Sequence, residues 1–292
     1  MGAVAFELAN RRGDPIRGDA RFPDAPAGKL PTVVVCHGFK GFKDWGFFPH
    51  LGERLAGAGF LSVCFNFSGS GVGADLQNFT DLDRFASDTI SQQIDDLGCV
   101  LDAVESGRVG GGRAELRRLG VLGHSRGAAT AILRAHEDPR LRSVIAWAPV
   151  SSILRWSDRE LAQWRAQGYL EFLNTRTGQQ MRVNYTTIED WLANRDRFDL
   201  RRAVAELASP LLIVHGEEDL SVRVEEGREL HEAAAGRGKC ELVVLPHTGH
   251  TFGVEHPWKG PTPALERAID RSVVWFEQSL GVPTGGVTQH ER

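Results

Sequence analysis

Continuously apolar runs alternate with amphipathic stretches along most of the chain. Six short runs are apolar at nearly every position, which predicts strands buried on both faces of a sheet. They cover residues 31–38, 60–67, 118–123, 143–149, 209–216 and 240–246. Five other stretches repeat their apolar positions at helical spacing. They cover residues 47–59, 86–106, 127–138, 224–236 and 264–280. This alternation predicts an α/β fold, with a mostly parallel central sheet and helices on both faces.

The segment 151–205 interrupts this alternation. It contains three tryptophans, Trp156, Trp164 and Trp191, and two strand-like runs that flank turn-forming residues, which predicts a hairpin. We expect a small inserted cap over the carboxyl edge of the sheet, where open α/β sheets bind ligands. The predicted organisation is a first part of the core over 1–150, the cap over 151–205, a second part of the core over 206–280, and a disordered polar tail over 281–292.

Composition excludes several classes of protein. The 292 residues are 41% hydrophobic and 25% charged, with a net charge of −4 and no block of lysine or arginine. This pattern argues against a nucleic-acid or membrane-surface partner. Neither a signal peptide nor a membrane span is recognisable, so we expect a cytoplasmic protein. The four cysteines form no CxxC pair and no HExxH motif occurs, so we expect neither a metal nor a cofactor. A homodimer remains an open possibility.

The stretch GHSRG at 123–127 is the first candidate for chemistry. It follows a predicted strand and precedes a predicted helix, which is the setting of a nucleophile elbow. Such a sharp turn requires small neighbours, and Gly123 and Gly127 provide them. Ser125 would then be the nucleophile. The backbone N–H of Arg126, at the start of the helix, would face a developing oxyanion.

A serine nucleophile needs a base, and the base needs an acid to orient it. The loop HTGHTF after the last strand offers His247 and His250, and we favour His250 because it lies deeper in the loop beside Gly249. The loop after the preceding strand offers three acids, Glu217, Glu218 and Asp219. The resulting order of serine, acid and histidine along the chain is that of α/β hydrolases.

The glycine-rich loop 37–46 follows the first strand of the pattern and predicts a second oxyanion donor, the N–H of Phe39. We expect the Arg126 side chain to pair with a carboxylate rather than bind an anionic substrate. The candidate pocket residues are His124, Trp156, Trp164 and Trp191. The stretch GSGVGA at 69–74 nearly fits a dinucleotide-binding motif. The following helix starts too late for that role, so we expect a loop that borders the active site.

Four motifs together resemble the α/β-hydrolase superfamily: HGF after the first of these strands, GHSRG, HGEED with Val222 after it, and GHTF. The closer resemblance, over roughly residues 30–280, is to the branch of bacterial cinnamoyl and feruloyl esterases, dienelactone-hydrolase-like proteins and serine aminopeptidase-type lipases. It implies that Asp219 is the triad acid and that Phe39 and Arg126 supply the oxyanion donors. In that branch the residue after the nucleophile is commonly Gln, Met or Gly, so the arginine at 126 is a departure.

These observations predict a serine hydrolase that cleaves a carboxylic ester of a small or medium acyl group, aromatic groups included. The predicted triad is Ser125, His250 and Asp219. Two alternatives remain open at this point. One is a peptidase or amidase of the same fold, and the other is a member of the fold that binds a ligand without catalysis.

Overall fold

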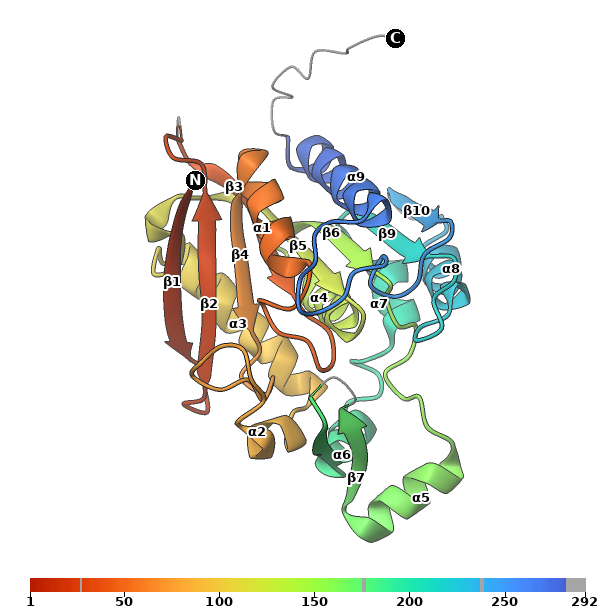
Figure 1. The fold of residues 1–292 in the computed structure, drawn as a ribbon. Coiled ribbons are helices and arrows are strands. Elements are labelled where there is room, and N and C mark those ends of the chain that lie inside the picture. The colour runs from red at the N-terminus through yellow and green to blue at the C-terminus, as the bar shows by residue number, and fades with distance from the viewer. Residues whose placement is uncertain (27, 175–176, 237–238, 282–292) are drawn as a thin grey trace.

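Eight strands form one central sheet in the computed structural model, which describes residues 1–26, 28–174, 177–236 and 239–281. The strand order is β1-β2-β4-β3-β5-β6-β9-β10 (Figure 1). The six predicted strands are present as β3 (Leu30–Cys36), β4 (Leu61–Asn66), β5 (Ala114–His124), β6 (Leu141–Trp147), β9 (Leu211–Gly216) and β10 (Cys240–Leu245). All pairings among these six are parallel. Of the tail expected to be disordered, only Gly281 belongs to the described residues.

The other two strands, β1 (Gly2–Ala9) and β2 (Pro15–Phe22), form an antiparallel hairpin at one edge of the sheet. The apolar pattern does not reveal them. Most side chains of β1 are exposed or half-buried, and β2 contains proline, glycine and three charged residues. The charges are accommodated by pairing, since Asp19 of β2 accepts a 2.8 Å hydrogen bond from the buried Lys43 ammonium. Edge strands of this kind carry a weaker sequence signal than central ones.

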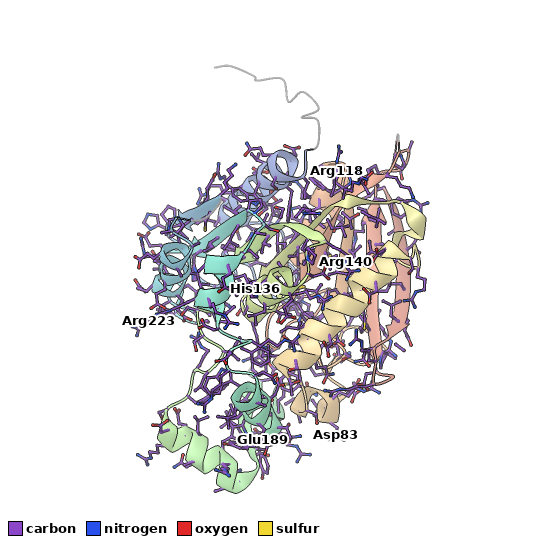
Figure 2. All side chains as sticks on the ribbon, turned by 180° about the vertical axis from the view of Figure 1, so that it is seen from behind. Asp83, Arg118, His136, Arg140, Glu189 and Arg223 are labelled. Carbon is purple, nitrogen blue, oxygen red and sulfur yellow. The ribbon has the colours of Figure 1, made fainter. Side chains whose placement is uncertain are left out.

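Helices cover both faces of the sheet. On one face, α1 (Phe48–Gly57) and α9 (Pro263–Leu280) pack against the strands in a shared hydrophobic cluster (Figure 1). On the other face lie α3 (Ile90–Glu105), α4 (Arg126–Glu137), α7 (Leu200–Glu206) and α8 (Val224–Ala233). Figure 2, viewed from behind, shows α3 crossing this second face. None of the helices in the described part of the chain combines the length and hydropathy that crossing a membrane requires.

The predicted helix 86–106 is present from Ile90 to Glu105 and therefore starts four residues later than expected. A short helix, α2 (Leu82–Ala86), is followed by α3, and Thr89 caps the start of α3 by accepting a hydrogen bond from the N–H of Gln92. A capping threonine satisfies one of the free N–H groups at a helix start and therefore fixes the boundary. Asp88 lies in the short link between the two helices and is buried, with 2% of its surface exposed.

The segment 151–205 folds over the edge of the sheet, as Figure 1 shows. Its elements outside the core are α5 (Asp158–Gln167), β7 (Tyr169–Asn174), β8 (Gln179–Asn184) and α6 (Thr186–Ala193), and its last residues belong to α7 on the second face of the sheet. The strands pair as the predicted hairpin and form a second, two-stranded sheet. Trp164, Met181, Val183 and Ile188 pack with three phenylalanines of the core in a third hydrophobic cluster. In Figure 2, Glu189 on α6 and Asp83 on α2 mark the region where this segment meets the core.

Candidate active site

Ser125 lies in the turn between β5 and α4. Its backbone has φ 56° and ψ −123°, a strained conformation for a residue with a side chain. The turn is held in place because the N–H of Ser125 donates a 2.8 Å hydrogen bond to the carbonyl of Trp147 on β6. A strained serine at the end of a central strand is the geometry that presents a hydroxyl above a sheet.

The two glycines that flank this turn leave no room for a side chain. A Cβ atom at Gly123 would lie 2.2 Å from the carbonyl oxygen of Gly127, and one at Gly127 would lie 2.3 Å from that of His37. Both obstructions are backbone atoms, which cannot rotate away. Glycine at 127 therefore permits the close approach of α4 to the loop after β3, and glycine at 123 permits the close approach of the end of β5 to the start of α4.

We expect Gly127→Ala to lower the free energy of unfolding by about 3 kcal/mol, because the new methyl group would displace backbone in a packed interior. Gly57→Ala is the matched control. Gly57 is exposed at the end of α1, with no atom within 4 Å of an added Cβ. That change is expected to raise the free energy of unfolding by about 0.4–1 kcal/mol. Urea denaturation of both variants measures the difference, and equal stabilities would contradict the steric argument.

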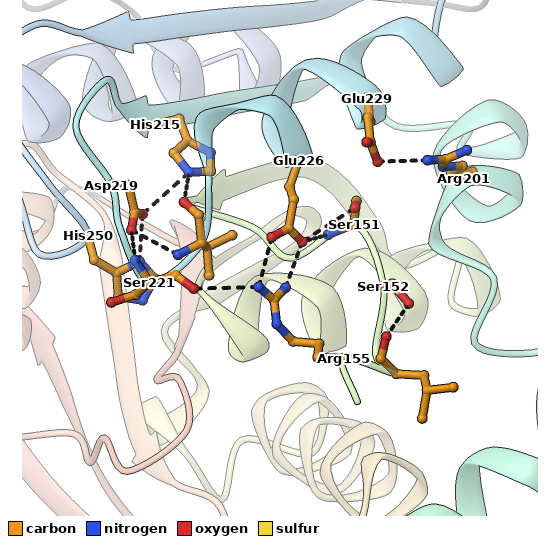
Figure 3. Close-up of polar contacts among 12 residues, drawn as sticks. Ser151, Ser152, Arg155, Arg201, His215, Asp219, Ser221, Glu226, Glu229 and His250 are labelled. Carbon is orange, nitrogen blue, oxygen red and sulfur yellow. Dashed lines mark hydrogen bonds and ion pairs between the residues drawn. The ribbon is translucent and has the colours of Figure 1, made fainter. Parts of the chain in front are cut away.

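His250 and Asp219 are hydrogen-bonded to each other. The Nδ1 atom of His250 lies 2.7 Å from Oδ2 of Asp219 (Figure 3). The other carboxylate oxygen, Oδ1, accepts hydrogen bonds from the N–H groups of Ser221 and Val222 at 2.8 and 2.9 Å. Nε2 of His215 lies 3.4 Å from Oδ2 of Asp219. The carboxylate is therefore fixed from several directions, and it orients the imidazole of His250.

This arrangement sets the ionisation of the acid. Burial alone would raise the pKa of Asp219, but hydrogen bonds from His215 and His250 and from the backbone N–H of Val222 hold that pKa well below its usual range. Hydrogen bonds to the charged form of a carboxyl group favour ionisation. Asp219 therefore carries a negative charge beside His250 throughout the neutral pH range.

The alternative candidates lie apart from this arrangement. His247 is 89% exposed, and its ring is 3.4 Å from the carboxylate of Glu218. Glu217 and Glu218 are both exposed. Neither His247 nor the two glutamates line the cavity described next. Among the candidates from the sequence, the structure brings together His250 and Asp219.

A cavity of about 570 Å³ lies between the core and the segment 151–205. Ser125 and His250 both line it. The four pocket candidates, His124, Trp156, Trp164 and Trp191, line it as well. Nε2 of His124 lies 2.9 Å from the carbonyl oxygen of His250. Burial lowers the pKa of His124 to about 3, so this ring is neutral and supports the loop of the candidate base.

The two candidate oxyanion donors belong to segments that adjoin Ser125, the start of α4 and the loop after β3. The N–H of Arg126 is one of the four at the start of α4 that have no partner within the helix. Gly38, next to Phe39, approaches the elbow so closely that an added Cβ would lie 3.0 Å from Cβ of Ser125. Within the described residues no main-chain acceptor takes the N–H of Phe39. The Arg126 side chain forms an ion pair with Asp88, in agreement with the expectation that it pairs with a carboxylate.

A sequence model of the alpha/beta hydrolase family matches residues 33–260. The chain belongs to this family. This α/β hydrolase is 23% identical over 286 residues to a Methylorubrum extorquens protein named "Putative carboxymethylenebutenolidase", covering 95% of this chain and 82% of that one. The esterase domain of a Rhodothermus marinus protein has 18% identity and a TM-score of 0.66, and covers 96% of this chain and 100% of that chain.

Est1E from Butyrivibrio proteoclasticus, in a structure with ferulic acid bound, has 17% identity and a TM-score of 0.71. The alignment covers 94% of this chain and 99% of that chain. Together with the family match, these likenesses confirm the predicted fold and the predicted resemblance to this superfamily.

Two contacts of this α/β hydrolase are not evident from the sequence. His215 supports Asp219 from within β9, and Asp88 is the partner of Arg126. Neither has a sequence signal, because each contact depends on how the elements pack. The loop 69–74 was expected to border the active site, but it does not line the cavity. Instead, an added Cβ at Gly69 would lie 2.4 Å from Oδ1 of Asp88, so this loop packs against the partner of Arg126.

A link between the cap segment and the core was also not anticipated. The carboxylate of Glu226 on α8 accepts hydrogen bonds from the Arg155 guanidinium at 2.7 and 2.9 Å, and from the N–H of Ser151 at 2.9 Å (Figure 3). Arg155 lines the cavity. Its charge is therefore neutralised by a residue of the core.

Proposed function

We propose that this α/β hydrolase cleaves carboxylic esters through a triad of Ser125, His250 and Asp219. The observation that carries the proposal is the 2.7 Å contact between His250 Nδ1 and Asp219 Oδ2, on a ring that lines the same cavity as Ser125. The bond to Nδ1 leaves Nε2 as the nitrogen that can accept a proton. This is the division of roles that a serine hydrolase requires.

In the proposed reaction the Oγ atom of Ser125 attacks the ester carbonyl carbon while Nε2 of His250 takes the serine proton. The N–H groups of Phe39 and Arg126 donate hydrogen bonds to the oxyanion. The carbon–oxygen bond to the alcohol then breaks, and His250 returns the proton to the departing alcohol. A water molecule, deprotonated by His250, attacks the carbonyl carbon of the acyl-enzyme, the bond from that carbon to Oγ of Ser125 breaks, and His250 returns the proton to Oγ as the acid leaves. Asp219 remains ionised and stabilises the imidazolium in both halves.

The cavity lining indicates the kind of acyl group. Apolar and aromatic side chains predominate, and among the described residues that line the cavity none is acidic. Two of the cations that line it, Arg126 and Arg155, are paired with Asp88 and Glu226. A cavity of this volume holds a small or medium ligand. We therefore propose a neutral, apolar acyl group, aromatic acyl groups included; ferulic acid bound to Est1E supports this choice.

Hydrolysis of p-nitrophenyl esters from acetate to long acyl chains, with methyl ferulate and an aminoacyl anilide alongside, tests this proposal. We expect turnover of the short, medium or aromatic esters and none of the anilide. Turnover of the anilide alone would replace the proposal by an amidase. A protein that is labelled at Ser125 by a fluorophosphonate but turns over no substrate of the panel would point to a ligand-binding member of the fold.

Asp219→Asn is expected to lower kcat by about 10⁴-fold, because an amide at this position favours the wrong tautomer of the histidine. It should also change how stability depends on pH. A carboxylate whose pKa is depressed on folding stabilises the protein above its unfolded-state pKa of about 3.9. That contribution is lost as the pH falls through the lower, folded-state pKa.

The difference in free energy of unfolding between the wild type and Asp219→Asn should therefore be constant above about pH 5 and shrink below about pH 4. Urea denaturation across pH 3–8 measures this difference. A difference that grows as the pH falls would contradict the depressed pKa of Asp219.

A further inference from the structure

The guanidinium of Arg126 contacts the loop that carries the first proposed oxyanion donor. Its Cζ atom lies 4.6 Å from the centre of the Phe39 ring. A planar cation over an aromatic face is an attractive contact, stronger where water is excluded. Arg126 follows Ser125 directly, so one side chain links the nucleophile elbow to the loop after β3.

Asp88 holds this guanidinium in place. Its Oδ2 atom forms the ion pair with Arg126 and also accepts a 2.7 Å hydrogen bond from Gln93. The backbone carbonyl of Asp88 accepts a 2.7 Å hydrogen bond from the hydroxyl of Thr187 at the start of α6. The carboxylate is thus fixed by α3 and attached to the cap segment through its own backbone.

The pair is not arranged for stability alone. Oδ1 of Asp88 and Nε of Arg126 are buried without a hydrogen-bond partner within the described residues. Unsatisfied polar atoms are costly, and a buried ion pair often contributes little net stability. Burial raises the pKa of Asp88 to about 6, although Arg126 lowers it. Nε of Arg134, farther along α4, is likewise buried without a partner in the described part of the chain, so what distinguishes Arg126 is its contact with the Phe39 ring beside the nucleophile.

The Phe39 ring is enclosed by several elements. Besides Arg126, it stacks on Phe85 of α2 at 5.3 Å between ring centres. It also meets Phe172 of β7 at 5.7 Å. Because the ring and the N–H belong to the same residue, these contacts restrict the direction of the N–H. An oxyanion donor is effective only where its direction is fixed before the reaction.

We propose that Arg126 is a positioning residue, whose guanidinium, anchored by Asp88, holds Phe39 so that the Phe39 N–H faces the oxyanion. The part of this inference that concerns catalysis rests on the proposed function. The part that concerns the order of the loop does not. In this role Arg126 contributes twice, through its own N–H and by fixing the other donor. An alternative role for the charge of Arg126 is recognition of an anionic acyl group. In that role its loss would change KM for anionic esters.

Arg126→Met and Arg134→Met make a matched comparison. Both arginines lie on α4 and are about one-fifth exposed, at 20% and 19%, and each pairs with a buried aspartate, Asp88 or Asp138. Only Arg126 contacts Phe39. Hydrogen exchange followed by mass spectrometry reports on the peptide 37–46 without depending on any substrate. We expect its amides to exchange about tenfold faster in Arg126→Met and at the wild-type rate in Arg134→Met.

Kinetics on neutral esters provide the second measurement. Removal of an oxyanion donor lowers kcat by about 10²–10³-fold, so a misdirected donor should cost about 10–100-fold. We expect this loss in kcat of Arg126→Met, with KM changed less than threefold, and partial recovery in Arg126→Lys, which retains the charge. If Arg126→Met does not fold because Asp88 is left unpaired, the double variant Arg126→Met with Asp88→Asn replaces it in both measurements, since it lacks both charges.

The inference is wrong if Arg126→Met shows both the wild-type exchange rate in peptide 37–46 and the wild-type kcat. A loss confined to KM for anionic esters would replace it by anion recognition. If the wild-type protein hydrolyses no ester, the proposed function fails, and the exchange comparison alone decides whether Arg126 orders the loop.

Discussion

Ser125→Ala should lower ester turnover by about 10⁶-fold, to the level left by the remaining site, because loss of a triad nucleophile removes the covalent pathway. The fold should tolerate the change. The serine side chain makes no capping hydrogen bond to α4. At a φ of 56°, alanine is strained about as much as serine, so the substitution leaves the backbone strain of this turn unchanged.

The measurement is kcat for a p-nitrophenyl ester, together with the melting temperature and labelling by a fluorophosphonate. Ser106→Ala, a serine at the far end of α3, is the control and should behave as the wild type. We expect Ser125→Ala to melt within a few degrees of the wild type, without label and without turnover. Undiminished turnover in a folded, purified variant would refute the assignment of the nucleophile.

His250→Gln should have an effect of similar size, about 10⁵–10⁶-fold in kcat, since the nucleophile and its base act as one unit. Glutamine can still donate to Asp219 but cannot take a proton from Ser125. The neighbouring histidine supplies the control. His247 is 89% exposed and lies outside the cavity, so His247→Gln should retain wild-type kcat.

Steady-state kinetics of the two histidine variants, with fluorophosphonate labelling rates, separate the candidates. Glutamine at 250 should slow labelling as well as turnover, because the probe also needs an activated serine. The opposite outcome, an inactive His247→Gln and an active His250→Gln, would assign the role of base to His247. It would also contradict the proposed role of Asp219, which contacts His250.

The sequence predicts the central architecture because its signal there is strong. Strands such as β3 and β9 are buried at every position, so their apolar runs are continuous. The hairpin of β1 and β2 has no such signal. Its apolar positions are interrupted by charges, and Asp19 pairs with the more distant Lys43 as well as with Arg21 on the same strand. Patterns within one segment cannot reveal pairing between segments.

The same distinction applies to the candidate site. Ser125 and His250 are indicated by short motifs at strand ends, where the topology of a parallel sheet brings loops together. Only the resemblance to a family favours Asp219 over its two acidic neighbours. The sequence indicates that Arg126 needs a carboxylate but not which one. Asp88 is 38 residues away, and only the packing of α3 against α4 brings the pair together.

The separation of the two sheets has an evolutionary consequence. Among the described residues, β7 and β8 of the cap hairpin pair with each other and share no strand with the eight-stranded sheet. A lineage can therefore lengthen, shorten or replace this hairpin without altering the register of β5, β9 and β10, whose following loops carry Ser125, Asp219 and His250. Selection on the choice of acyl group can then act on most of the hairpin without moving those strands, whereas Phe172 of β7, which packs on Phe39, ties one hairpin position to the oxyanion loop.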